Sequence, residues 1–229
     1  RGLDAEYTVT PLTDNDWAYS WQKYYKPLEV GRRLYVVPEW MRDEPVPEGR
    51  SPLYLNPGLT FGTGSHATTR LCLTALEETI HGGERVLDLG CGSGILSIAA
   101  LRLGAESAIG IDIDPKAEDI ARENAAYNGF AAPAFTALTG NVTEDTALMD
   151  TLAANRYDLV LVNIVADVII GLAPVLPHFL NESSTLICSG ILDTRLSDVL
   201  DALTAAGLTV TATKAKDDWR CVTAIRKYI

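Results

Sequence analysis

Apolar and polar positions alternate in two different ways along the chain from about residue 84 onward. Short apolar runs predict buried strands, and longer segments with apolar residues every three or four positions predict helices that cover them. Strands are expected at RVLDLG, SAIGIDID, YDLVLVNI and STLICSGI, with a weaker one at AFTALTG. Because helical segments separate these strands, the pattern predicts a parallel sheet with helices on both faces.

Turn-forming residues mark where several of the expected helices begin and end. Asp114 is placed to cap a helix whose first residue is Pro115, and the pair at 128–129, Asn-Gly, is a typical helix end. Another helix is expected over 165–179, where two prolines must bend or end it, and one more over 194–206.

The end of the chain, LTVTATKAKDDWRCVTAIRK, shows two strand patterns around a short polar turn at 216–218. Two such runs joined by a turn predict an antiparallel hairpin. Right-handed crossovers between the preceding strands make the sheet doubly wound. The expected fold is therefore α/β, a doubly wound sheet closed by a C-terminal antiparallel hairpin, with ligands bound beyond the carboxyl ends of the strands.

The first 55 residues differ from the rest, since they hold three of the four tryptophans and six of the nine tyrosines. Within them RRLYVVPEW predicts a strand, and the proline-rich EPVPEGRSP predicts a connector. Four aromatic residues at helical spacing favour packing over a cofactor site; they are Trp17, Trp21, Tyr24 and Tyr25. We expect a linker and strand region over 1–50 and one larger domain over 51–229.

Composition and charge narrow the classes of partner. The formal net charge of -11 repels phosphate backbones and favours a basic partner, although it would equally serve solubility. The four cysteines form no C-x-x-C pair and indicate free thiols in a reducing compartment. No signal peptide or membrane span is recognisable, so the cytoplasm is the expected location. The three histidines show no metal-ligand spacing, and no metal is expected.

The stretch VLDLGCGSGILSIAA carries an apolar strand into a glycine-rich loop. Its glycines, Gly90, Gly92 and Gly94, stand at alternate positions after Asp88. The fingerprint of a dinucleotide-binding loop is G-x-G-x-x-G. Whether the pattern is started at Gly90 or at Gly92, no glycine stands at its third glycine position. The sequence also does not match the phosphate-binding loop of nucleotide hydrolases, because no Lys-Ser or Lys-Thr pair follows the glycines.

A nucleoside that carries an amino acid fits this loop better than a diphosphate does. Its carboxylate meets loop amides, and its ammonium needs an anion such as Asp88, directly or through water. Asp112 closes the next strand, 22 residues after Gly90, where an acid accepts hydrogen bonds from ribose hydroxyls. The glycine spacing therefore favours S-adenosylmethionine over a nicotinamide dinucleotide; the alternative is that both acids only cap strand ends.

The run from Asp88 to Gly94 resembles the first motif of class I S-adenosylmethionine-dependent methyltransferases. A narrower resemblance, to the PrmA family, lies in NPGLTFGTGSHATTRLCLTALE, in DWAYSWQKYYKPLEVGRRLYVVPEW, and in VNIVAD, SGIL and WRCVTAIRK. It covers nearly all the chain from about Asp14, and its most specific part is the pattern FGTGSHATT at 61–69. Members of that family methylate the eleventh protein of the large ribosomal subunit.

The resemblance implies a Rossmann-like methyltransferase sheet of seven strands and an S-adenosylmethionine-dependent protein-lysine N-methyltransferase. Its acceptors would be lysine side-chain and N-terminal α-amines of a basic ribosomal protein, with no direct contact to nucleic acid or membrane, and the enzyme is expected to be a monomer. The residues expected to contact the cofactor are Thr69, Asp88, Gly90, Gly92, Asp112 and Asn163. Family members carry a small N-terminal domain that captures the substrate, so residues 1–50 are expected to be the linker that follows it.

Asn163 is the expected catalytic residue, because it ends the fourth strand, where the methyl group should face its acceptor. The residues after it, Ile164-Val165-Ala166, contain no proline and no aromatic ring. An aliphatic wall suits a tetrahedral amine better than a flat base, which favours protein methylation over nucleic-acid methylation. Three alternatives stay open: a small amine or RNA as acceptor, a silent S-adenosylmethionine-binding remnant, and a nicotinamide-dependent dehydrogenase, which the glycine spacing disfavours.

Overall fold

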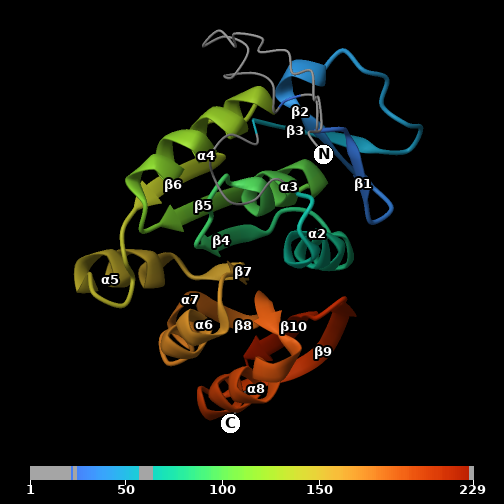
Figure 1. Ribbon diagram of the computed structural model, residues 1–229. Coiled ribbons are helices and arrows are strands. Elements are labelled where there is room, and N and C mark those ends of the chain that lie inside the picture. The colour runs from blue at the N-terminus through green and yellow to red at the C-terminus, as the bar shows by residue number, and fades with distance from the viewer. Residues whose placement is uncertain (1–21, 23–24, 57–63, 227–229) are drawn as a thin grey trace, which may run out of the picture.

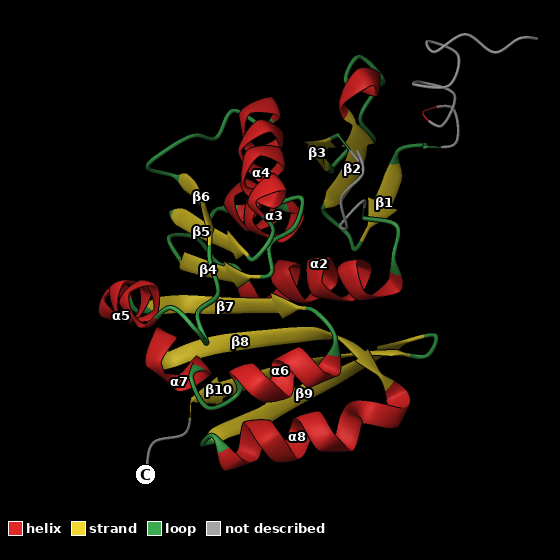
Figure 2. Ribbon diagram, turned by 60° about the vertical axis from the view of Figure 1, so that its left-hand side comes forward, coloured by secondary structure: helices red, strands yellow, loops and turns green. Residues whose placement is uncertain are grey.

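The computed structural model describes residues 22, 25–56 and 64–226, and it shows one large twisted sheet between two layers of helices (Figures 1 and 2). The strand order is β6-β5-β4-β7-β8-β10-β9. Strands β4 to β8 are mutually parallel, and β10 runs antiparallel to both β8 and β9. The doubly wound seven-stranded sheet with its closing hairpin is therefore confirmed. Its strands are β4 (Arg85–Leu89), β5 (Ser107–Asp112), β6 (Phe135–Thr139), β7 (Tyr157–Asn163), β8 (Leu180–Leu192), β9 (Leu208–Lys216) and β10 (Trp219–Arg226).

The helices divide into two groups, one on each face of the sheet (Figure 2). One face is covered by α2 (Ala67–Thr79), α3 (Ile95–Leu103) and α4 (Pro115–Tyr127). The other is covered by α5 (Thr146–Asn155), α6 (Ala166–Leu172), α7 (Leu176–Phe179) and α8 (Leu196–Ala205), and a short 3-10 turn, η3 (Asp193–Arg195), precedes α8.

Strand β7 shows why the central strands read as continuous apolar runs. Leu159 and Leu161 belong to the core under α2 and α3, whereas Val160 and Val162 belong to the core under α6 and α8. All four side chains are fully buried. Since successive residues of a strand face opposite sides, a strand covered on both faces must be apolar at every position.

The helix boundaries follow the sequence signals in most places. The carboxylate of Asp114 accepts a hydrogen bond from the backbone N–H of Lys116, and α4 ends at Tyr127, directly before the Asn-Gly pair. The helix expected over 165–179 is two helices, α6 and α7, with a proline in the break between them. Helix α5 had no clear sequence signal, because Leu152 is its one fully buried residue.

A second, smaller sheet precedes the main one and consists of β1 (Leu28–Val30), β2 (Leu34–Pro38) and β3 (Ser51–Leu55), with a 3-10 turn, η2 (Glu39–Met41), after β2. Strand β3 pairs in parallel with β2. The expected division at residue 50 would separate these two strands, although side chains from both belong to the core under α2 and α3. The division stays a prediction.

Of the four aromatic residues expected to pack together, Trp17, Trp21 and Tyr24 lie outside the described residues. The fourth, Tyr25, meets the ring of Trp40 edge-on at a centroid distance of 6.4 Å. All four cysteines are free and buried. Within the described ranges, no helix is both long enough and apolar enough to cross a membrane.

Candidate functional site

The glycine loop lies between β4 and α3, beyond the carboxyl end of the strand. Gly90 has a φ of 78°, a left-handed conformation that strongly favours glycine. A Cβ atom at Gly90 would also lie 2.6 Å from Cγ2 of Ile164, at the end of β7. The packing of the loop against β7 therefore requires glycine here, independently of the close ligand approach that the sequence suggested.

Asp112, at the end of β5, fixes the shape of this loop. One carboxylate oxygen accepts the N–H of Gly92 at 2.9 Å, and the other accepts the N–H of Asp114 at 3.0 Å. The Asp112 carboxylate therefore does cap backbone N–H groups at a strand end, which the sequence analysis gave as the alternative to ligand binding. Because a carboxylate offers about four acceptor positions, two of them remain for hydroxyl groups of a ligand.

Asp88 lies beneath the loop, and its side chain is buried with 1% relative exposure. Its Oδ2 accepts hydrogen bonds from the hydroxyl and the backbone N–H of Ser97, at 2.8 and 3.2 Å. Its Oδ1 is buried without a hydrogen-bond partner among the described residues. Burial raises the pKa of Asp88 to about 7, against the opposing effect of the two Ser97 hydrogen bonds.

Asn163 ends β7, the neighbour of β4, at the same edge of the sheet. Its Oδ1 is also buried without a hydrogen-bond partner within the described ranges. Buried polar atoms are rarely left unpaired, so the two oxygens of Asp88 and Asn163 favour a polar ligand at the carboxyl ends of β4 and β7, although Nε of Arg102 and Oη of Tyr157 are also unpaired among the described residues.

Exposed aliphatic side chains occur at the same ends of the strands. The described part of the chain holds five exposed large apolar residues, and four of them lie at or shortly after the carboxyl ends of β5, β7 and β8. They are Ile113 (73% exposed), Val165 (62%), Val168 (47%) and Leu192 (42%). An apolar surface around a few convergent polar groups is typical of a ligand site. Sequence reasoning noticed only Val165, although an apolar residue just past a strand end is a usable signal.

The segment before the glycine loop contributes α2, whose first turn contains Thr69. Thr69 is buried with 3% relative exposure, and its expected contact with the cofactor stays a prediction. His66 has a structural role: its ring nitrogen lies 2.8 Å from the hydroxyl of Thr68 and its ring packs edge-on against Trp219. Residues 61–63 of the FGTGSHATT pattern lie outside the described residues.

The chemistry of this donor set fits S-adenosylmethionine. Asp112 can accept hydrogen bonds from ribose hydroxyls, and the unpaired oxygen of Asp88 provides an acceptor near an ammonium group. Ile113 offers an apolar surface to an adenine ring. No cluster of three potential metal ligands occurs within the residues that the structure covers. A sheet of this strand order, with a glycine loop after β4 and an acid at the end of β5, defines a class I S-adenosylmethionine-dependent methyltransferase.

Comparison with known proteins identifies the family. The sequence profile described as "Ribosomal protein L11 methyltransferase (PrmA)" matches residues 2–227. The "Ribosomal protein L11 methyltransferase" of Symbiobacterium thermophilum is 40% identical over 215 residues, which are 94% of this chain and 67% of that protein. The protein of the same name from Geobacter metallireducens is 42% identical over 215 residues, 94% of this chain and 68% of its own length. The chain belongs to the PrmA family of ribosomal protein L11 methyltransferases.

A solved structure agrees with this assignment. The crystal structure of a ribosomal protein L11 methylase from Lactobacillus delbrueckii subsp. bulgaricus superimposes with a TM-score of 0.77 at 32% identity. The match covers 89% of this chain and 100% of that one. The fold seen here is therefore that of a known methylase over nearly the whole described length.

Proposed function

We propose that this chain transfers methyl groups from S-adenosylmethionine to lysine side-chain and N-terminal α-amines of ribosomal protein L11. The observation that carries the proposal is the buried Oδ1 of Asn163, which has no hydrogen-bond partner among the described residues, at the carboxyl ends of strands that also carry exposed aliphatic residues. The names of the relatives support the choice of substrate. The net charge of -11 supports a basic protein as partner, and a reducing cytoplasm suits the four free thiols.

The cofactor would be held on the β4 and β5 side of the site. Gly90 and Gly92 would let the loop backbone approach the methionine part closely, because they carry no side chain; their own N–H groups are already donated to Ile111 and Asp112. Asp112 would accept the ribose hydroxyls, and Thr69 would contribute from the first turn of α2. When bound, S-adenosylmethionine supplies an activated methyl group on a sulfonium centre, so the protein mainly aligns the two partners.

The acceptor would approach on the β7 side. A lysine amine with a reference pKa of about 10.4 costs roughly 4 kcal/mol to deprotonate at pH 7.5. The aliphatic side chains of Val165 and Leu192 disfavour the charged ammonium and so lower its pKa. Asn163 is no base, but its Oδ1 can accept a hydrogen bond from the amine N–H and orient the nitrogen lone pair. A flat base would find no aromatic ring to stack on in the residues 163–166.

Labelled methyl transfer tests the proposal directly. The chain would be incubated with labelled S-adenosylmethionine and, in separate reactions, with purified ribosomal protein L11, ribosomal RNA and small amines. We expect label in the protein, on lysine and N-terminal amines, and none in RNA. Label in RNA or in small amines alone would overturn the substrate assignment. Cofactor binding without transfer to any acceptor would favour a silent remnant.

A binding titration separates the cofactor assignment from the substrate assignment. We expect micromolar affinity for S-adenosylmethionine or its demethylated product, and no measurable affinity for a nicotinamide dinucleotide. The reverse result would indicate the dehydrogenase alternative.

A further inference from the structure

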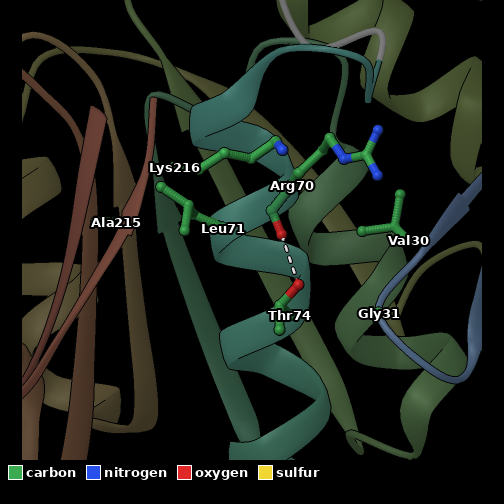
Figure 3. A pocket seen from close by; sticks show the side chains of 7 residues that line it. All are labelled: Val30, Gly31, Arg70, Leu71, Thr74, Ala215 and Lys216. Carbon is green, nitrogen blue, oxygen red and sulfur yellow. Dashed lines mark hydrogen bonds between the residues drawn. The ribbon is translucent and has the colours of Figure 1, made fainter. Parts of the chain in front are cut away.

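A pocket of about 250 Å³ lies away from the strand-end site, between three parts of the chain that are distant in sequence. Val30 ends β1 and Gly31 begins the turn to β2, and Ala215 and Lys216 come from the end of β9. Helix α2 forms the floor with three residues: Arg70, Leu71 and Thr74. Figure 3 shows the Lys216 side chain reaching across the pocket toward the side chain of Arg70.

The two cations in this pocket have few partners. Neither Arg70 nor Lys216 forms an ion pair within the part of the chain that the structure describes. The guanidinium of Arg70 makes one long hydrogen bond, 3.4 Å to the backbone oxygen of Glu29. Two like charges that face one pocket repel each other, and an anion between them would remove that repulsion.

Three glutamates lie close to the pocket in the chain, but each is bound to another group. Glu29 forms an ion pair with Arg50 at 2.6 Å, and Glu78 forms an ion pair with Lys214. The carboxylate of Glu77 accepts three backbone N–H groups of the turn between β1 and β2, from residues 32–34. None of these three carboxylates is therefore paired with Arg70 or Lys216 among the described residues.

The wall opposite Lys216 is held in a fixed position. The turn that contains Gly31 lies directly over Glu77, and a Cβ atom at Gly31 would be 2.3 Å from a carboxylate oxygen of that residue. Thr74 is likewise tied to α2, since its hydroxyl donates to the backbone oxygen of Arg70 at 2.9 Å (Figure 3). An incoming ligand would therefore meet a formed pocket, and only the long side chains of Arg70 and Lys216 would need to be ordered.

We propose that this pocket binds a small oxyanion, a phosphate or a carboxylate group, between the guanidinium of Arg70 and the ammonium of Lys216. Guanidinium presents paired N–H donors that match two oxygens of such a group, and the lysine adds a point charge from the opposite wall. Val30 and Leu71 give apolar contacts to the carbon atoms of an organic anion. None of the residues proposed to bind the cofactor or the acceptor lines this pocket, so the site is separate from that of methyl transfer.

Bound anion would stabilise the fold by mass action, since it ties the hairpin to α2 and to the small sheet. The test is a thermal unfolding series with sodium phosphate and, separately, sodium acetate, each against sodium chloride at equal ionic strength. We expect a saturable rise in Tm of about 2–4 °C for the intact chain. The backbone amide signals of Gly31 and Thr74 should shift along the same saturation curve in NMR spectra.

Substitutions of the two cations and of a neighbouring lysine test whether the rise in Tm comes from this pocket. Lys216→Gln and Arg70→Gln should each abolish the saturable rise, whereas Lys214→Gln, which removes the same charge from a lysine already paired with Glu78, should keep it. Lys216→Glu should pair with Arg70 directly and make Tm independent of added anion. Saturation by phosphate alone or by acetate alone would support the proposal and identify the group.

Equal stabilisation of the parent chain and of Lys216→Gln would show general exclusion of phosphate from the protein surface, and it would overturn the proposal. The absence of any saturable shift with both anions would overturn it as well. Because all these variants lie outside the methyl-transfer site, cofactor affinity serves as a check that they are folded.

Discussion

The two halves of the strand-end site differ in their polarity. On the side of β4 and β5, two carboxylates, Asp88 and Asp112, receive backbone N–H groups from the glycine loop and the segments after it. On the side of β7 and β8, a neutral amide, Asn163, stands among exposed aliphatic side chains. The acid nearby in sequence, Asp167, is paired with Arg195 at 2.7 Å.

This difference matches the two partners of methyl transfer. A cofactor with an ammonium group and ribose hydroxyls needs acceptors, and in the proposed arrangement the charged half would supply them. An amine that must lose a proton before it reacts needs low polarity, and the aliphatic half would supply that. Changes on the first side should therefore alter cofactor affinity, and changes on the second side should alter transfer or substrate affinity.

The largest effect is expected from Asp112→Ala. The substitution removes the proposed ribose acceptor and also leaves the N–H groups of Gly92 and Asp114 without their partner. Hydrogen bonds to a charged group are worth about 1.5–3 kcal/mol, so cofactor affinity should fall by roughly 100-fold. Calorimetric titration measures this loss.

Asp114→Ala is the matched control for that experiment. The Asp114 carboxylate caps α4 through Lys116 and has no proposed contact with the cofactor. It should lower stability by about 1 kcal/mol and leave cofactor affinity nearly unchanged. Unchanged affinity in Asp112→Ala would refute the placement of the ribose.

The next largest effect is expected from Asn163→Ala. Loss of one orienting hydrogen bond should slow methyl transfer by roughly 10- to 30-fold, while cofactor affinity changes little. Asn181→Ala removes an asparagine side chain at the opposite end of the sheet, near the start of β8, and should leave the rate unchanged. Single-turnover kinetics with saturating cofactor gives the comparison; a drop in affinity that matched the drop in rate would assign Asn163 to the cofactor half instead.

Asp88 should make cofactor affinity depend on pH. Burial raises its pKa to about 7, so the carboxylate ionises mainly between pH 6 and 8. An ammonium group binds the ionised form better, and affinity should rise by up to about tenfold across this range. Asp88→Asn should show weaker binding with a flat pH profile, and an unchanged slope in the variant would mean that another group titrates.

The same shift predicts an opposite trend for stability without ligand. The unfolded chain ionises Asp88 near its ordinary pKa of 3.8, before the folded chain does. The unfolded state therefore binds fewer protons between about pH 4 and 7, and the free energy of unfolding falls as pH rises through that window. Urea unfolding at pH 5 and pH 8 should show a smaller decline in Asp88→Asn than in the parent chain.

The smallest effect is expected from Leu192→Ser. The side chain is 42% exposed, so stability should change little, but the acceptor loses part of its apolar contact. We expect KM for ribosomal protein L11 to rise about threefold with unchanged cofactor affinity. Ile225→Ser is the matched control, because Ile225 is also an exposed apolar residue but pairs with Thr185 near the start of β8. Equal effects of both substitutions would show that Leu192 is not part of the acceptor site.

Local sequence signals were enough to locate most elements of the sheet and several of the site residues. Alternating patterns marked the strands, and cap residues marked α4, because these preferences act within a few positions of the chain. Helix α5 was not predicted because it buries few side chains. Strands β1 and β3 were not predicted because a short strand is defined by the strand it pairs with. The sequence also predicts Asp88 beside a ligand, and that contact stays a prediction; the structure adds that Oδ2 of Asp88 is held by Ser97.

What the sequence by itself determined is the order of the main strands and of the helices with clear signals, the glycine loop, and the polar residues Asp88, Asp112 and Asn163. What only the tertiary structure decided is which of their oxygen atoms stay unpaired, which aliphatic residues meet at one edge, and that Arg70 and Lys216 share a pocket. The physical reason is that strand pairing brings together residues far apart in the chain, and burial, pairing and pKa depend on those neighbours rather than on local sequence.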